Sequence, residues 1–283
     1  MKKSKKIILI ISLIIFCAGL AMSTVSACMI NFDFSQLDTN EYVVKKKDIS
    51  EDFSNIDIHT VSMDITFERS SDNACHVEYT ESSSNKFKVD LKDGTLHIDS
   101  ESDNWVIHAV NYFNFSFLHN KVTVYLPDKD YRSLDISTVS GDIAVNGFSF
   151  GNVKLGSTSG DISFSSQCAS LDINTTSGEI DVKDIADGKD LSVNTVSGDL
   201  NISGCRFTET SVHTTSGDIS IDKTAPGKGS ITTVSGDVNG KLVGDYEINT
   251  NTVSGDVDVA DSRKGAPRID IHTTSGDISI EKD

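Results

Sequence analysis

The sequence predicts an all-β protein, a single-chain β-solenoid (parallel β-helix) with coils of about 19 residues, preceded by an N-terminal apolar helix. Three observations predict it. Glycine and small polar residues are abundant while prolines number only 3, short segments alternate between apolar and polar residues, and one hexapeptide recurs at a nearly constant spacing. Alternation with period 2 is typical of half-buried strands, and a constant period is typical of stacked repeats.

The first thirty residues indicate export. Four lysines within residues 2–6 precede an uncharged, mainly apolar run at 7–30. Such a flank keeps the N-terminus cytoplasmic, so the remainder is predicted to be extracytoplasmic and anchored to the cell membrane. Two forms of anchor remain open. The run exceeds the ~20 residues that cross a bilayer, which favours an uncleaved helix, but residues 25–28 also resemble a lipobox in which Cys28 is the lipidation candidate.

The repeat has the form Thr-x-Ser-Gly-Asp followed by an aliphatic residue, with Ser in place of Thr once and Glu in place of Asp once. Its glycines are Gly141, Gly160, Gly178, Gly198, Gly217, Gly236, Gly255 and Gly276. Two short strands cannot bury a core alone, whereas stacked coils spaced by about 4.8 Å can. The sequence therefore predicts that consecutive coils stack on one another.

Each coil is predicted to contain a strand, a tight turn, a second strand and a looser return. Leu134-Asp-Ile136 precedes the first turn and Ile143-Ala-Val145 follows it. The alternation predicts that one side of each strand is buried. We expect the glycine to supply a positive φ at the corner, and the serine and aspartate to bond nearby backbone groups.

Stacking places the acidic residues of the repeat in one column. Its members are Asp142, Asp161, Glu179, Asp199, Asp218, Asp237, Asp256 and Asp277. Like charges at this spacing repel unless turn hydrogen bonds or cations offset them. We expect turn hydrogen bonds, with a cation ladder through these acids as the alternative. The sequence indicates no other metal site, no cofactor and no catalytic residue.

The preceding segment is predicted to contain degenerate coils. Met63 stands where the repeat has glycine, and the 78 residues from Met63 to Gly141 correspond to about four periods. The predicted organisation is a linker at 31–47, degenerate coils at 48–133 and regular coils at 134–283, continuous with them. This amounts to about twelve coils and a rod of about 55 Å, with the last coil of the sequence as an open rung.

Aromatic residues cluster in one insertion, at Trp105, Tyr112, Phe113, Phe115 and Phe117. The cluster forms either a partner- or lipid-facing patch, or the core of one coil together with a loop folded over the solenoid. Alternation in its second half favours the core.

Acidic residues dominate the predicted ectodomain. The net charge is −17, and without the four N-terminal lysines 21 basic residues face 42 acidic ones. Such a surface repels nucleic acid and attracts cationic peptides or basic envelope proteins. Cys168 and Cys205 are predicted to lie two coils apart, about 9.6 Å, so free thiols are expected.

The Ser-Gly-Asp-Ile coils, together with the segments 48–58, 93–98 and 122–127, resemble the putative-adhesin β-strand-repeat family of unknown function, which is common in Gram-positive bacteria. The resemblance implies a surface-exposed β-solenoid. It also implies a possible place in the cell-envelope stress response, including the response to cationic antimicrobial peptides, and it supplies no catalytic residues.

The favoured function is a non-catalytic, membrane-anchored module that is adhesin-like or binds cationic peptides under envelope stress. The alternatives are a polysaccharide-acting β-helix enzyme and a structural surface spacer. Catalysis needs a unique cluster of groups with separated pKa values, whereas each repeat Asp has close equivalents in the other coils.

Overall fold

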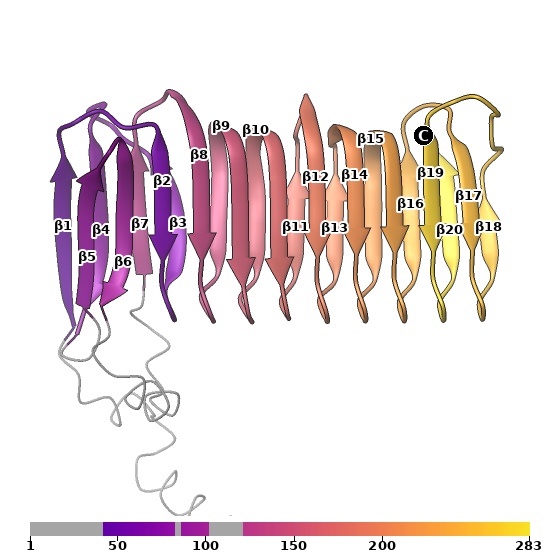
Figure 1. Cartoon of the computed structure of the whole chain (residues 1–283), viewed down its shortest axis with the longest axis horizontal. Coiled ribbons are helices and arrows are strands. Elements are labelled where there is room, and N and C mark those ends of the chain that lie inside the picture. Colours follow the sequence, from indigo (N-terminus) through magenta and orange to yellow (C-terminus); the bar gives the residue numbers. More distant parts are fainter. Residues whose placement is uncertain (1–41, 83–85, 102–120) are drawn as a thin grey trace, which may run out of the picture. The chain divides into compact units, whose positions relative to one another are not determined.

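The computed structural model describes residues 42–82, 86–101 and 121–283, and in these residues it contains twenty strands and no helix. The strands stack side by side into two faces (Figure 1). The first face contains, in stacking order, β5 (Lys86–Lys92), β6 (Thr95–Glu101), β2 (Asn55–His59), β8 (Asp130–Ser137), the second halves of β9 (Ile143–Ser157) and β10 (Ile162–Thr175), β12 (Gly188–Asn194), β14 (Arg206–His213), the second half of β15 (Ile219–Thr232), β19 (Arg268–His272) and β17 (Glu247–Asn251).

The second face contains, in stacking order, β1 (Val43–Ile49), β4 (Cys75–Glu81), β7 (Lys121–Leu126), β3 (Asp64–Arg69), the first halves of β9 and β10, β11 (Ile180–Lys183), β13 (Leu200–Ser203), the first half of β15, β16 (Val238–Leu242), β20 (Ile278–Lys282) and β18 (Val257–Val259). From β3 to β18 all pairings on this face are parallel, and the register shifts in the β9–β10 and β15–β16 pairs. The predicted all-β solenoid is therefore present in the described residues.

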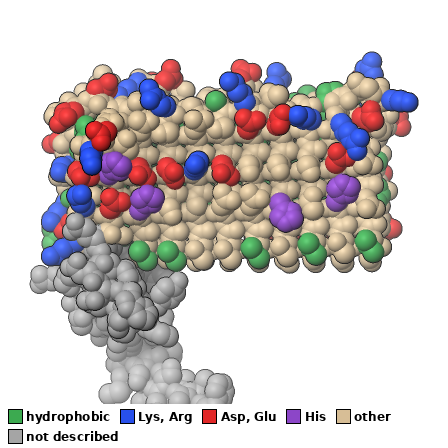
Figure 2. Space-filling view, in the orientation of Figure 1, with side chains coloured by type: hydrophobic (Ala, Val, Ile, Leu, Met, Phe, Trp, Pro, Cys, Tyr) green, Lys and Arg blue, Asp and Glu red, His purple; other side chains and the backbone are tan. Residues whose placement is uncertain are grey.

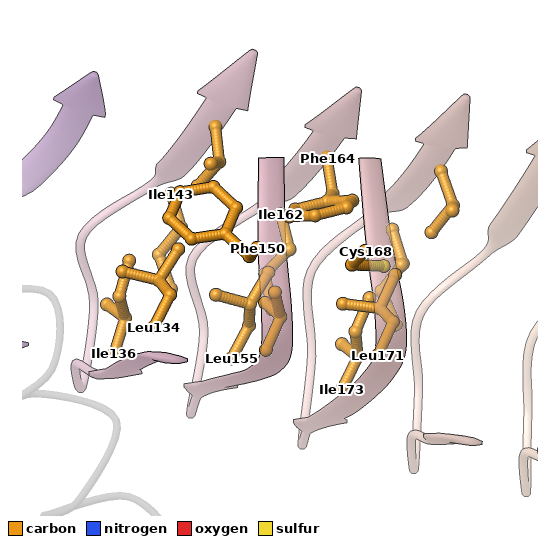
Figure 3. Close-up of a cluster of buried hydrophobic side chains, with 14 of the residues drawn as sticks. Leu134, Ile136, Ile143, Phe150, Leu155, Ile162, Phe164, Cys168, Leu171 and Ile173 are labelled. Atoms are coloured by element: carbon orange, nitrogen blue, oxygen red, sulfur yellow. The ribbon is translucent and has the colours of Figure 1, made fainter. Parts of the chain in front are cut away.

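Aliphatic side chains from both faces fill the interior. On the first face Leu134, Val153 and Leu171 lie in one column, and on the second face Ile143 and Ile162 are direct neighbours. All five are buried, and Figure 3 shows how columns from the two faces meet. Burial of one such side chain stabilises the fold by about 1.5–3 kcal/mol, so the stacked columns are the main source of stability.

The degenerate segment is not a run of successive coils, and the prediction of four periods between Met63 and Gly141 is wrong. β2 pairs directly with β8, and β3 pairs with both β7 and β9. At the same corner the Thr60 hydroxyl donates to Thr138 Oγ1 at 3.2 Å. The Met63 coil therefore lies immediately on the Gly141 coil.

The described strands between these two coils, β4 to β7, form a cap together with β1. β4 pairs antiparallel with β1 and β7, and β5 pairs antiparallel with β6. Asp93 (φ 52°) and Gly94 (φ 73°) have the left-handed backbone that a two-residue hairpin turn requires, so the chain reverses there. Sequence alternation is the same in a hairpin strand and in a coil strand, which is why it could not separate the two.

The cap includes the end of the predicted linker. β1 begins at Val43, inside the segment 31–47, and its seven residues pair with β4 from Val43–Glu81 to Ile49–Cys75. The linker prediction is therefore wrong at its C-terminal end.

The second face stacks twelve described strands, which corresponds to about 55 Å at the usual spacing between strands. Nine of these strands belong to coils with a corner, and the other three, β1, β4 and β7, belong to the cap.

The last two coils do not follow sequence order. β16 pairs with β20, and β20 pairs with β18, so residues 268–282 insert between the Gly236 coil and the Gly255 coil. The first face agrees, since β19 lies between β15 and β17. The prediction that the last coil of the sequence is the open rung is wrong.

A difference in core residues accounts for this order. The inserted coil directs four isoleucines inward, and all of them are buried: Ile269, Ile271, Ile278 and Ile280. The equivalent positions of the Gly255 coil hold Ile248, Thr250, Val257 and Val259, none of which is buried. Because buried apolar area stabilises the fold, the more apolar coil lies inside and the more polar one lies at the end.

Candidate functional surface

The corner of the coils is the most regular surface of the molecule. If a Cβ were added to a corner glycine, it would lie only 1.8–2.3 Å from the carbonyl oxygen of the corner beneath it. Among the corner glycines only Gly178 has a positive φ (132°). The expectation that glycine supplies a positive φ is therefore wrong for the other seven, where close stacking of the backbone is what requires it.

Met63 occupies the corner position of the first coil whose corner the structure describes. A Cβ added to a corner glycine would point toward the coil beneath it, as a Cβ on Gly141 would point toward the Met63 carbonyl. Met63 belongs to the first coil, and no described corner lies beneath it. A side chain is compatible there, and Met63 is buried in the core.

The acidic residues form a column of hydrogen bonds that is interrupted once, between Glu179 and Asp199. The carboxylate of Asp142 accepts the backbone N–H of Asp161 at 2.9 Å, and that of Asp161 accepts the N–H of Glu179 at 2.8 Å. The same bond recurs up the stack with distances of 2.8–3.1 Å, from Asp64 at the start to Asp256 at the end, through Asp199, Asp218, Asp237 and Asp277. Bonds of this kind offset the repulsion between neighbouring carboxylates, since each N–H places a partial positive charge beside a carboxylate.

Glu179 interrupts this pattern. Its carboxylate accepts the side-chain amide of Asn201 at 2.8 Å instead of a backbone N–H. The glutamate side chain is one methylene longer than aspartate, so its carboxylate reaches Asn201 on β13. The described residues include no group of three or more His, Cys, Asp or Glu side chains that is placed to hold a metal ion.

A second column at the corner consists of valines and threonines. The residue after the repeat threonine is Val or Thr, and Val196, Val234 and Val253 are exposed there. Exposed hydrophobic side chains of this kind form a row along one edge in Figure 2. The repeat threonine itself points inward: Thr138 and Ser157 are buried, and their hydroxyls accept the N–H of the corner glycine. We call the Asp/Glu column and this Val/Thr column together the corner ridge.

A histidine clasp at the cap was missed by sequence reasoning. His76 on β4 bonds Asp48 on β1 through Nδ1 at 2.7 Å and Asp72 through Nε2 at 2.9 Å. The hydrogen bonds to Asp72 and Asp48 raise the pKa of His76, and the bonds from Ser70 and His76 lower the pKa of Asp72. No spacing signal identifies such a cluster, because antiparallel pairing of two distant strands creates it.

Several predicted residues fall outside the described part of the chain. These are the lipidation candidate Cys28, the whole N-terminal segment, and the aromatic residues Trp105, Tyr112, Phe113, Phe115 and Phe117. In the part that is described, no helix has the length and apolar character needed to cross a bilayer. Cys75, Cys168 and Cys205 are buried and unpaired, and burial raises the pKa of Cys168 to about 12 and that of Cys205 to about 11.

The fold and the corner ridge define a class of protein: a capped β-solenoid whose coils stack through Ser-Gly-Asp corners. A family model described as Toastrack DUF4097 matches residues 53–283, and the chain belongs to this family. The match begins between β1 and β2 and covers every corner.

Solved structures share this fold. A protein from Parabacteroides merdae, described as a putative adhesin, is 14% identical and superposes with a TM-score of 0.51 over 86% of this chain and 96% of its own. One from Parabacteroides distasonis, described as a putative lipid binding protein, is 17% identical with a TM-score of 0.50 over 85% and 96%. At such identities the likeness establishes the fold alone. A comparison with curated proteins found no match.

Proposed function

We propose that this chain is a non-catalytic, membrane-anchored, extracytoplasmic binding module that captures cationic peptides along its corner ridge, in an adhesin-like or envelope-stress role. Basic envelope proteins are the alternative partners. The observation that carries the proposal is the acidic column of the ridge. Its nine members, from Asp64 to Asp256, lie in register with no basic residue among them, and all except the half-buried Asp237 are exposed.

The chemistry of the ridge suits an extended cationic chain. Carboxylates about 4.8 Å apart present a line of negative charge, and lysine or arginine side chains of a peptide can follow it. The exposed valines and threonines of the same corner supply methyl groups beside this line. A peptide with both cationic and apolar side chains therefore fits better than a purely charged one.

Repetition supports binding over catalysis. The ridge presents nearly identical groups in each coil, which suits multivalent contact with a long partner and does not suit one unique reaction centre. The predicted export and anchor segment would hold the ridge outside the cell, where such peptides and envelope proteins occur.

Titration of the full chain, held in detergent micelles, with a lysine-rich amphipathic peptide tests the proposal. The variant Asp161→Asn/Asp199→Asn/Asp218→Asn keeps an oxygen that can accept the backbone N–H but removes three ridge charges. Exposed charge pairs contribute about 0.2–1 kcal/mol each, so we expect about tenfold weaker binding and a shallower dependence on salt.

A matched variant separates the ridge from total charge. Asp187→Asn/Asp190→Asn/Asp222→Asn removes three exposed carboxylates that lie outside the corner. Equal losses of affinity in the two triple variants would show that net charge, and not the ridge, attracts the peptide. Absence of binding at low salt would reject the proposal altogether.

A further inference from the structure

The two ends of the described stack both leave strand edges unpaired. Among the described strands, those of the outermost coil have one partner each: β17 pairs with β19, and β18 pairs with β20 (Figure 1). The start of β17 is partly covered, because Ser262 Oγ accepts the N–H of Ile248 at 3.0 Å. No described strand lies beyond β18, so its outer edge is open for pairing with another strand.

At the cap end, β1 pairs only with β4 among the described strands. β1 is antiparallel to β4, and β4 is antiparallel to β7, so β1 runs in the same direction as β7 and every later strand of the second face. The β1 edge of a second copy can therefore join β18 as a parallel strand. A translation along the stack brings the second copy into this position.

The charges of the two ends are complementary. β1 contains Lys45, Lys46 and Lys47, and all three are exposed, although Lys45 also pairs with Glu81. The outer coil carries exposed Asp256 and Asp258 and no lysine or arginine within β17 or β18. Opposite charges at two unpaired edges favour contact between unlike ends and disfavour contact between like ends.

Exposed apolar side chains also concentrate at the ends. The described residues expose seven large hydrophobic side chains, and four of them lie in the two end elements: Val43 (54%) and Val44 (70%) at the cap, and Val253 (79%) and Val257 (44%) in the outer coil. Each end thus combines an open edge, exposed valines and a net charge of one sign, positive in β1 despite Asp48 and negative in the outer coil despite Arg263 and Lys264. These are the components of a β-strand addition site.

We infer that the protein associates with itself head to tail, with β1 of one copy pairing with β18 of the next. The occupant of the open edge is a second copy of this chain. The interface joins two different surfaces, so it does not close on itself and produces linear chains of molecules. Association places the lysines of β1 beside the carboxylates of the outer coil, so salt weakens it.

Cysteine crosslinking of the full chain, at fewer than one molecule per detergent micelle, tests which ends meet. One preparation carries Val44→Cys, a second carries Val257→Cys, and a short bismaleimide joins thiols that lie close together. The parent chain gives the baseline for its native cysteines. We expect dimers above the baseline only when the two preparations are mixed.

The other outcomes overturn the inference. Dimers in the Val257→Cys preparation alone would show tail-to-tail contact, and dimers in the Val44→Cys preparation alone would show contact between caps. A mixture that stays at the baseline would show that the ends do not meet.

Sedimentation supplies a second, independent measurement on the full chain. The variant Val257→Lys/Asp258→Lys places positive charge on the open edge, and we expect its self-association to be at least tenfold weaker than that of the parent. The control variant Val196→Lys/Asp190→Lys makes the same change in charge at two exposed positions in the middle of the stack. Val196 is exposed to a similar extent (50%) as Val257 (44%), and this variant should associate like the parent. Equal association of both variants, or a parent that is monomeric at every concentration, would refute the head-to-tail interface.

Discussion

Replacement of Gly217 by alanine tests the close stacking of the corners most directly. A Cβ at this position would lie 2.1 Å from the carbonyl oxygen of Gly198 and 2.8 Å from its carbon. The backbone of two coils has to separate by about 1 Å to restore contacts above 3 Å. Neither atom belongs to a flexible side chain, so the coils themselves must move.

Three hydrogen bonds join these two coils at the corner. Ser216 N donates to Val196 O at 2.8 Å, Asp218 N donates to the Asp199 carboxylate at 2.9 Å, and Leu200 N donates to Asp218 O at 2.9 Å. A separation of about 1 Å lengthens them beyond hydrogen-bonding range. At about 0.5–1.5 kcal/mol for each neutral bond, and up to about 3 kcal/mol for the bond to the carboxylate, Gly217→Ala should reduce the free energy of unfolding by about 3–5 kcal/mol.

Urea unfolding followed by circular dichroism measures this loss, and Gly156→Ala is the matched control. A Cβ at Gly156 would have no neighbour closer than 3.7 Å, and its φ is not positive. We expect the control to change stability by less than about 1 kcal/mol, since alanine fits an ordinary strand position. If Gly217→Ala were as stable as Gly156→Ala, close backbone stacking would not be the reason for the corner glycines.

Two further predictions concern the cap and the coil order. His76 should titrate above its ordinary pKa of about 6.5, and Asp72→Asn should lower its pKa in an NMR titration. Because the pKa of His76 is raised in the folded state, protonated His76 stabilises the protein fully below about pH 6.5. This stabilisation is lost as the pH rises through the pKa of the folded state. A free energy of unfolding that stays constant across that pH range would contradict the clasp. Cysteines introduced at Asn239 and Ser279, which face each other across β16 and β20, should crosslink efficiently, whereas cysteines at Asn239 and Asp258, two strands apart, should not. The reverse result, read by mass spectrometry of the linked peptides, would restore sequence order to the coils.

Regular repetition is the feature that sequence reasoning handles best. The spacing of Gly141, Gly160 and Gly178 predicted that their corners lie over one another, and the backbone contacts between these corners confirm it. The acidic column followed from the same spacing. A period in the sequence becomes a period in space whenever each coil can bury its apolar side only against a neighbour.

Irregular parts were predicted less well, for physical reasons. The strands β4 and β5 alternate like coil strands, but they pair antiparallel with their neighbours, and alternation carries no information about strand direction. The histidine clasp on Asp48, His76 and Asp72 depends on that pairing. Its residues are spread over 29 positions of the sequence, without a motif.

The amino-acid sequence by itself determined that this protein is a stack of glycine-cornered coils with an aliphatic interior and an acidic edge, because those properties repeat locally in every coil. Only the tertiary structure decided which coils are neighbours. Met63 lies beneath Gly141 although 78 positions of the sequence separate them, and the isoleucine-rich coil at 268–282 lies inside the Gly255 coil. Every corner offers nearly the same hydrogen bonds to the next, so these bonds do not determine which coils are neighbours. The order of the coils is determined by the burial of apolar side chains over the whole stack.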